Sequence, residues 1–195
     1  MDLLLMGGWM MWPLTLISIA VTAIIIERLL LFSSFRFPSR RMTALLEQAV
    51  QGDKAPLLAE MKKTDALRTF ADLLDSDRPG KEAALRIEGD AVVRKLEARL
   101  SMLSILARLA PLMGLLGTVL GMMETFSEIA DAQAGVNMNQ LAGGIWQALI
   151  TTAAGLFIAV PALFFLHCFQ TRTDAAASAL SEAANAVLAA DGEAQ

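Results

Sequence analysis

Three long apolar blocks interrupt an otherwise charged sequence. They cover about residues 9–32, 108–130 and 141–169, and no run of alternating apolar and polar residues indicates a β-strand. A helix of about 20 apolar residues crosses the roughly 30 Å hydrocarbon core of a bilayer. The pattern therefore predicts an all-α integral membrane protein with three transmembrane helices whose apolar surface contacts the lipid bilayer.

The residues at the ends of the blocks fit this interpretation. Trp9 and Trp12 are suited to a water–lipid interface, and Pro13 is suited to the first turn of a helix, where its missing N–H loses no partner. The most apolar part of the second block, 109–123, is only about 22 Å long as a helix. Its flanking charges, Arg108 and Glu124, must therefore reach outward or face protein.

The basic residues predict how the chain is oriented. Of the sixteen Lys and Arg residues, Arg28 and Arg172 flank the first and third blocks, and the other fourteen lie between Arg36 and Arg108. Cytoplasmic segments of membrane proteins carry the excess of Lys and Arg. We therefore expect the middle segment and the C-terminus in the cytoplasm and the N-terminus outside.

The chain accordingly divides into seven segments. In chain order these are an external N-terminus (1–8), the first transmembrane helix (9–32), a cytoplasmic helical segment (33–107), the second transmembrane helix (108–130), a short external loop (131–140), the third transmembrane helix (141–169) and a cytoplasmic helical tail (170–195).

Helix-forming residues continue the second and third spans beyond the membrane. After Gly80 the sequence is rich in Ala, Leu, Glu and Arg, and only Gly89 weakens this preference before the second span. We expect one helix that begins near Lys81 and runs into the second span, and a third helix that continues beyond Arg172 into the cytoplasm.

Composition narrows the classes of function. The chain is 55% hydrophobic with a net charge of −4, and its mean hydropathy is +0.52, so nothing favours nucleic acid as a partner. A single Cys168 cannot form an internal disulfide, and the lone His167, interpreted as an interfacial residue, cannot make a metal site. No nucleophile–base pair or phosphate-binding loop is recognisable in the sequence, so we expect neither an enzyme nor a cofactor.

Small residues recur on one face of the second and third spans. Such stripes let helix backbones approach closely in lipid, and the short connection predicts that the two helices form a tight antiparallel hairpin. Pro161 is expected to loosen or kink the third helix. The stripe residues are Gly114, Gly117 and Gly121 in the second span and Ala148, Thr152, Gly155, Ala159 and Ala162 in the third.

Four uncharged polar residues within the spans admit two interpretations. Thr118, Thr151 and Thr152 either bond carbonyls of their own preceding turn or line a hydrated path for ions. Gln147 is either a packing residue between helices or a member of the same path.

Two acidic residues, Glu124 and Glu128, lie one turn apart near the outer end of the second span. They are either solvated interfacial acids or ionisable members of the path. Three spans alone enclose little space for these polar groups. We therefore expect an oligomer around a shared interior.

Two stretches carry a family resemblance. APLMGLLGTVLGMMETF at 110–126 and LAGGIWQALITTAAGLFIAVPALFF at 141–165 resemble the paired motifs of the MotA/TolQ/ExbB proton-channel family, and VTAIIIERLL at 21–30 supports the resemblance. Three spans with a long cytoplasmic middle segment resemble the ExbB and TolQ branch, because the MotA branch has four spans and a larger cytoplasmic domain.

The resemblance implies a homopentamer in the bacterial inner membrane, with a periplasmic N-terminus and with the second and third spans around a central pore. It also implies two partners. One is a single-span ExbD- or TolR-like protein inside the pore, which carries an essential aspartate, and the other is a TonB- or TolA-like protein that transmits work to the outer membrane. The expected function is a proton-channel or motor subunit that uses the proton motive force to energise outer-membrane transport.

The resemblance also implies roles for individual residues. The pore threonines of the family correspond to Thr118 and Thr152, with Thr151 beside the latter, and its helix-kinking proline corresponds to Pro161. One position departs from the pattern. Where ExbB and TolQ have glutamate, this sequence has Gln147, whose amide forms hydrogen bonds but cannot titrate.

Three accounts of Gln147 are open at this point. The chain is an engineered neutral mimic, or a natural variant in which the aspartate of the partner suffices, or one in which Glu124 supplies the carboxylate at a similar depth. We expect the proton path of the family to be retained in form but weakened or silent at Gln147. Two further functions also fit the sequence: a TolQ-like subunit of a Tol-Pal system, and a membrane scaffold that conducts no protons.

Overall fold

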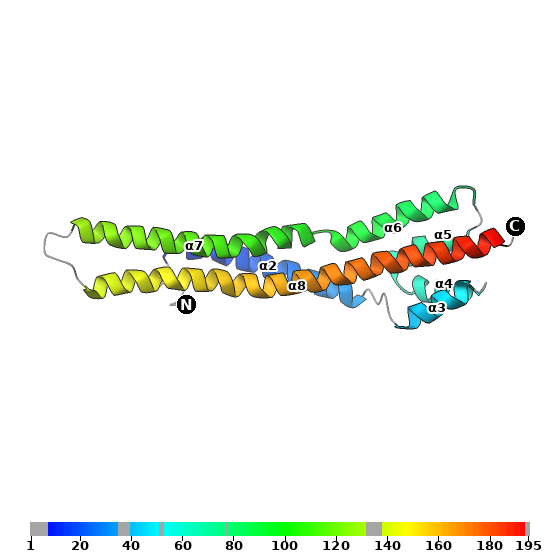
Figure 1. Ribbon diagram of the computed structural model, residues 1–195, viewed down its shortest axis with the longest axis horizontal. Helices are drawn as coiled ribbons and strands as arrows, with labels where there is room; N and C mark the ends of the chain where they lie inside the picture. Colours follow the sequence, from blue (N-terminus) through cyan, green and yellow to red (C-terminus); the bar gives the residue numbers. More distant parts are fainter. Residues whose placement is uncertain (1–7, 35–39, 51–52, 77, 132–137, 194–195) are drawn as a thin grey trace. The chain divides into compact units, whose positions relative to one another are not determined.

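The computed structural model describes residues 8–34, 40–50, 53–76, 78–131 and 138–193 of the 195-residue chain. Within these ranges the chain forms helices and turns without a β-strand, which confirms the all-α class (Figure 1). Three of the helices are long and apolar enough to cross a membrane, as predicted. Most of the predicted external N-terminus and external loop, residues 1–7 and 132–137, lies outside the described residues.

One long apolar helix comes first, a run of shorter helices follows, and two long helices end the described chain. In chain order they are α2 (Met11–Ser34), α3 (Arg40–Val50), α4 (Ala55–Lys62), the short 3₁₀ helix η1 (Asp65–Leu67), α5 (Arg68–Asp75), α6 (Lys81–Glu97), α7 (Leu100–Asp131) and α8 (Met138–Glu193). The third span and the polar tail belong to the single helix α8, so the predicted continuation of that helix is confirmed.

Internal packing divides the chain into two units, which we describe separately. The apolar unit comprises Met1–Glu27 and Arg99–His167, and the polar unit comprises Arg28–Ala98 and Cys168–Gln195. The boundary falls inside α2 and α8, and it falls between α6 and α7 in the middle of the chain.

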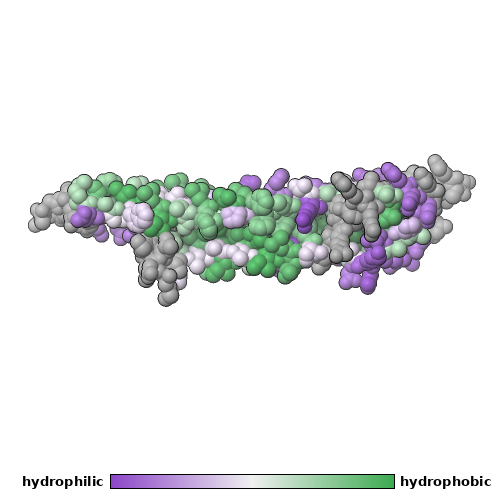
Figure 2. All heavy atoms as spheres, turned by 90° about the horizontal axis from the view of Figure 1, so that it is seen from below, coloured by the Kyte–Doolittle hydropathy of each residue, from purple (hydrophilic) through white to green (hydrophobic). Residues whose placement is uncertain are grey.

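The apolar unit consists of α7 together with the first parts of α2 and α8. Its three helices expose many large apolar side chains, and Figure 2 shows mostly green atoms over these helices. A surface of this kind is unfavourable in water and favourable in a bilayer. Together with the length of the helices, it identifies the chain as a membrane protein. The most exposed of these side chains are Trp12, Leu16, Met138, Phe157, Val160 and Phe164.

The polar unit has the core of a soluble helical domain. Leu57, Met61 and Phe70 of α4 and α5 are buried with Leu85 of α6. The part of α8 in this unit buries one residue every three or four positions, which is the period of an amphipathic helix packed against protein. These residues are Phe169, Thr173, Ala176, Leu180, Ala183 and Val187.

The predicted single helix from Lys81 into the second span is wrong in one respect. Helix α6 does begin at Lys81, but it ends at Glu97, and α7 begins at Leu100. Ala98 has an extended ψ of 137°, and Arg99 has a left-handed φ of 64°. Two residues that are not helical therefore separate α6 from α7, where the sequence predicts one continuous helix.

Contacts from α2 provide the physical reason for this break. The buried Arg28 donates hydrogen bonds from Nη1 to the carbonyl oxygens of Lys95 at 3.1 Å and Leu96 at 3.4 Å. In a continuous helix these carbonyls would instead accept from the amides of Arg99 and Leu100. A tertiary contact thus satisfies carbonyls at the end of α6, and sequence periodicity could not reveal it.

Candidate functional site

The faces of α7 and α8 that carry small residues lie against each other within the apolar unit. A Cβ atom added at Gly114 would lie 2.9 Å from the carbonyl oxygen of Thr151, and one added at Gly155 would lie 2.5 Å from the carbonyl oxygen of Ala110. Both distances are too short for a real Cβ, so the two backbones are in direct contact at these glycines. Ala148, Ala159 and Ala162 of α8 are also buried.

The other two glycines of the α7 stripe also lie against α8. A Cβ added at Gly117 would lie 2.7 Å from Oγ1 of Thr151, and one added at Gly121 would lie 3.3 Å from Cβ of Ala148. Pro161 lies within α8, which continues through it.

The three candidate threonines satisfy their hydroxyl groups in two different ways. Thr118 donates to the carbonyl oxygen of Leu115 at 2.6 Å, and Thr151 donates to that of Ala148 at 2.6 Å. Both bonds are to the preceding turn, which is one of the two interpretations the sequence left open. Thr152 instead donates across the helix pair to the carbonyl oxygen of Gly114 at 3.0 Å.

A small cavity lies between α7, α8 and the residues before α2. Its volume is about 20 Å³, and its polar walls are Glu124, Gln147 and Thr151. A volume of this size holds about one water molecule, provided that polar groups surround it. The structure therefore brings Glu124 of α7 and Gln147 of α8 to one potential water site. Thr118, Thr152 and Glu128 are not among the residues that line it.

The chain before α2 also reaches this cavity, which the sequence did not predict. A Cβ added at Gly8 would lie 2.6 Å from Nε2 of Gln147, and Trp9 and Met10 line the cavity. Gly8 has a left-handed φ of 67°, a conformation that glycine adopts without a steric cost. The only sequence signal for this contact is the glycine pair just before the interfacial tryptophans.

The groups around the cavity have complementary chemistry for proton transfer. The carboxyl group of Glu124 can hold or release a proton, whereas the amide of Gln147 can only donate and accept hydrogen bonds. The hydroxyl group of Thr151 already donates to the carbonyl oxygen of Ala148, so at the cavity it can only accept a hydrogen bond. A water molecule between these groups would connect the carboxyl group to both.

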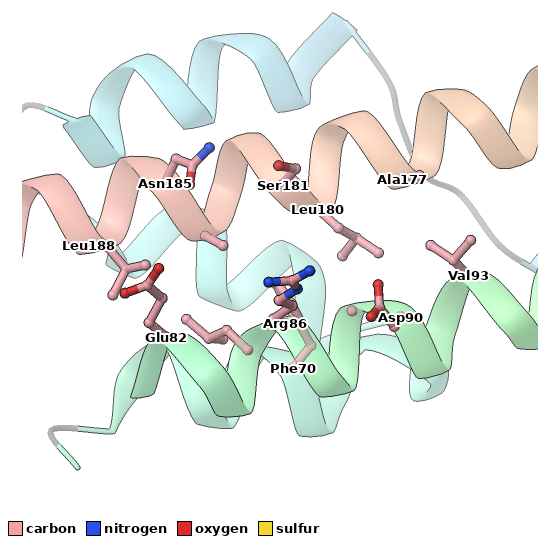
Figure 3. Close-up of a pocket in the computed structure, with 13 residues that line it drawn as sticks. Phe70, Glu82, Arg86, Asp90, Val93, Ala177, Leu180, Ser181, Asn185 and Leu188 are labelled. Carbon is pink, nitrogen blue, oxygen red and sulfur yellow. The ribbon is translucent and has the colours of Figure 1, made fainter. Parts of the chain in front are cut away.

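A larger cavity, of about 340 Å³, lies in the polar unit between α6 and α8. Figure 3 shows Glu82, Arg86 and Asp90 on the side of α6 that faces α8, which adds Ser181 and Asn185 to the lining. The three charged residues follow one another at four-residue steps and therefore share one helix face. The sequence did not predict this cavity.

The sequence matches a known protein family over most of its length. The sequence profile of the MotA/TolQ/ExbB proton channel family matches residues 48–182, which is more than half of the chain. The chain belongs to this family. The matched region contains both Glu124 and Gln147, so the small polar cavity lies between helices that the family profile covers.

Individual relatives in the family carry ExbB and TolQ names. The biopolymer transport protein exbB1 of Vibrio cholerae is 33% identical over 165 residues, which cover 80% of this chain and 72% of the relative. A putative ExbB-like 1 biopolymer transport protein of Synechocystis is 34% identical over 84% of this chain and 67% of the relative. The Tol-Pal system protein TolQ of Pseudomonas aeruginosa is 37% identical over 51% of this chain and 43% of the relative.

These similarities support the ExbB/TolQ branch of the family. The two relatives with ExbB names described above match over most of this chain, whereas the TolQ protein matches about half of it. The similarity therefore extends beyond the two motif stretches from which the resemblance was first recognised.

Proposed function

We propose that this chain is the proton-conducting subunit of an energy-transducing complex in a bacterial inner membrane. Five copies surround a central pore lined by α7 and α8, and a single-span ExbD- or TolR-like partner lies inside it. Proton movement through the pore drives work that a TonB- or TolA-like protein transmits to the outer membrane. Membership of the proton channel family and the three membrane-spanning helices support this proposal.

The proposed orientation follows from charge. The N-terminus lies in the periplasm, and the C-terminal part of α8 lies in the cytoplasm together with α3 to α6, because fourteen of the sixteen basic residues lie between Arg36 and Arg108. The seven segments expected from the sequence keep their boundaries in this proposal, with the external loop in the periplasm.

Within the pore-forming helices we propose that Glu124 carries the proton that a glutamate at position 147 would otherwise carry. The observation that supports this role is the small cavity shared by Glu124, Gln147 and Thr151. Gln147 and Thr151 bind the water molecule that hydrates the carboxyl group and so orient that group. Thr118 and Thr152 line the pore beyond the cavity. The glycines of α7 and Gly155 of α8 keep the two helices close enough to form it.

The test measures proton flux into proteoliposomes that contain the chain together with its ExbD- or TolR-like partner. Glu124→Gln is expected to reduce the partner-dependent flux about a hundredfold, which is a typical contribution of a proton-transferring side chain. Glu128→Gln is the matched control, because it removes the same charge one turn away from the cavity and should leave the flux unchanged.

Two results would contradict the role of Glu124. Equal losses in both variants would indicate a general effect of negative charge at the outer end of α7. An unchanged flux in Glu124→Gln would leave the partner's aspartate as the sole carrier. Gln147→Glu tests position 147 in the same assay, since equal flux with and without that change removes any role for the residue.

A TolQ-like role and a non-conducting scaffold are the competing functions. Similarity to the TolQ protein of Pseudomonas aeruginosa favours the first, and the amide at position 147 favours the second. Deletion of the gene separates ExbB-like from TolQ-like roles by the outer-membrane process that fails. A scaffold keeps its function in cells treated with a proton uncoupler, whereas a proton-driven subunit loses it.

A further inference from the structure

Another cavity of the polar unit lies beside the last turn of α2. Its volume is about 390 Å³, and pockets that hold small organic molecules measure about 300–1,000 Å³. Leu31 of α2, residues 63–66 between α4 and α5, and residues of the last two turns of α6 line it. All of these residues belong to the polar unit. The cavity is therefore large enough for a ligand and is formed within one unit.

This cavity lies at one end of a membrane helix. The first candidate membrane span is Met11–Ser33, so Leu31 is close to its end. The neighbouring Leu30 is 65% exposed, as expected of a side chain that contacts lipid. Arg28 of the same helix donates a hydrogen bond to the carbonyl oxygen of Lys95 at 3.1 Å. Lys95 and the end of α6 are thus held beside the end of the membrane helix.

The walls of the cavity combine apolar and basic side chains. Leu31, Val92 and Leu96 supply an apolar wall, and the last two are buried residues of α6. Lys63 and Lys95 line the same cavity and are exposed to solvent. A ligand that fits both parts has an apolar portion and a negatively charged group.

The polar groups of the cavity are accessible to such a ligand. In the described part of the chain, the ammonium group of Lys95 and the hydroxyl group of Thr64 have no protein partner. Lys63 forms an ion pair with Glu60 at 2.6 Å on the exposed surface. Exposed pairs of this kind contribute little free energy, so an anion can compete for the lysine.

One acidic residue, Asp65, also lines the cavity. Its carboxylate forms an ion pair with Nη1 of Arg68 at 3.2 Å, which compensates its charge. Two lysines and one compensated acid leave the lining with a net positive charge. Charge complementarity therefore favours an anionic ligand over a neutral or cationic one.

We propose that this cavity binds the phosphate group of an anionic phospholipid from the adjacent leaflet of the bilayer. Lys63, Lys95 and the hydroxyl group of Thr64 bind the phosphate oxygens, and the apolar wall contacts the first part of the acyl chains. Basic pockets beside membrane helices are suited to such headgroups. A free phosphate ion has the same charge chemistry but leaves the apolar wall without a partner.

A lipid in this position contacts α2, the segment before α5 and α6 at once, and so stabilises their packing within the polar unit. The inference requires only that α2 is inserted in a bilayer. It does not depend on the proton path or on Glu124, so it can fail while the proposed function stands, and the reverse is also true.

The test is native mass spectrometry of the full-length protein in neutral detergent micelles. The protein is titrated with dioleoylphosphatidylglycerol, which carries one negative charge, with dioleoylphosphatidylcholine, which carries no net charge, and with sn-glycerol 3-phosphate, which has no acyl chain. We expect the anionic lipid to bind most tightly. Equal binding of the two lipids would overturn the proposal, and equal binding of the anionic lipid and glycerol phosphate would assign the site to a soluble anion instead.

Four single variants then locate the site. Lys63→Gln and Lys95→Gln should each weaken binding of the anionic lipid about fivefold, the effect of one basic residue beside an anionic membrane. Lys62→Gln and Arg94→Gln are the matched controls, because each removes a positive charge next to one of these lysines but outside the cavity. Both controls should bind the anionic lipid as the unchanged protein does.

The comparison of these variants distinguishes a defined site from general attraction to a basic surface. Equal losses in all four variants would overturn the proposal, and so would unchanged binding in both Lys63→Gln and Lys95→Gln. The two lysines are exposed, so both variants are expected to fold. Lys95→Arg keeps the positive charge and should retain binding of the anionic lipid, whereas a loss equal to that of Lys95→Gln would contradict the charge argument.

Discussion

Replacing Gly155 by alanine tests the close approach of α7 and α8 directly. The new Cβ atom would lie 2.5 Å from the carbonyl oxygen of Ala110 and 3.2 Å from Cα of Gly114. Both neighbours are backbone atoms, which cannot rotate away as a flexible side chain can. The helices must therefore separate by several tenths of an ångström at the point where they are closest.

The expected loss of stability has two parts. Overpacking of a close-packed contact costs about 1–3 kcal/mol. Separation of the helices also weakens the bond from Oγ1 of Thr152 to the carbonyl oxygen of Gly114, at 3.0 Å, and interhelical bonds of this kind contribute about 0.6 kcal/mol in membranes. The packing loss, with the weakened bond included, is therefore about 2–4 kcal/mol.

Gly143→Ala is the matched control for this change. It lies in the same helix, and its added Cβ would meet nothing within 4 Å. Any gain in helix propensity from glycine to alanine, about 1 kcal/mol in water, is similar in the two variants. The difference between them therefore isolates the packing loss.

The assay is unfolding of the purified protein in mixed micelles by increasing fractions of a denaturing detergent, followed by circular dichroism. Gly155→Ala should unfold at a clearly lower detergent fraction than Gly143→Ala. Equal midpoints would refute the reasoning, because they would mean that α7 and α8 are not in backbone contact at Gly155.

Two further predictions concern side chains rather than backbones. Phe169→Ala should lower the free energy of unfolding by about 3–5 kcal/mol, because Phe169 is 1% exposed and stacks on Phe32 with ring centroids 5.3 Å apart. The control is Phe164→Ala, which removes a ring that is 63% exposed and should lower the free energy of unfolding much less in the same assay. Thr152→Val should lower the free energy of unfolding by about 0.6 kcal/mol, because it removes the hydrogen bond to the carbonyl oxygen of Gly114. An unchanged unfolding midpoint would contradict that bond.

The arrangement of the small residues could be anticipated from sequence, but their exact partners could not. Glycines at 114, 117 and 121 share a helix face because of their spacing, and close packing in lipid follows from their size. Which residue meets Gly117 depends on the vertical register of two helices joined by a short loop. The structure sets that register by bringing Gly117 to Thr151 and Gly121 to Ala148.

The break after Glu97 could not be anticipated, because every local signal favours a helix there. The decisive contact comes from Arg28, which is 67 and 68 positions away from its acceptors along the chain. Sequence periodicity reports which face of a helix is apolar and does not report a distant donor that competes for its carbonyls. The approach of Gly8 to Gln147 has the same long-range character.

The cavity beside Gln147 offers a reason for an amide at a position where glutamate is expected in ExbB and TolQ proteins. Its volume of about 20 Å³ leaves room for about one water molecule between Glu124, Gln147 and Thr151. Two ionised carboxylates around one water molecule would repel each other. An amide beside a single carboxylate avoids this repulsion and still bonds the water through its donor and acceptor atoms. Gln147 is therefore the neutral partner expected if Glu124 is the proton carrier, as proposed above.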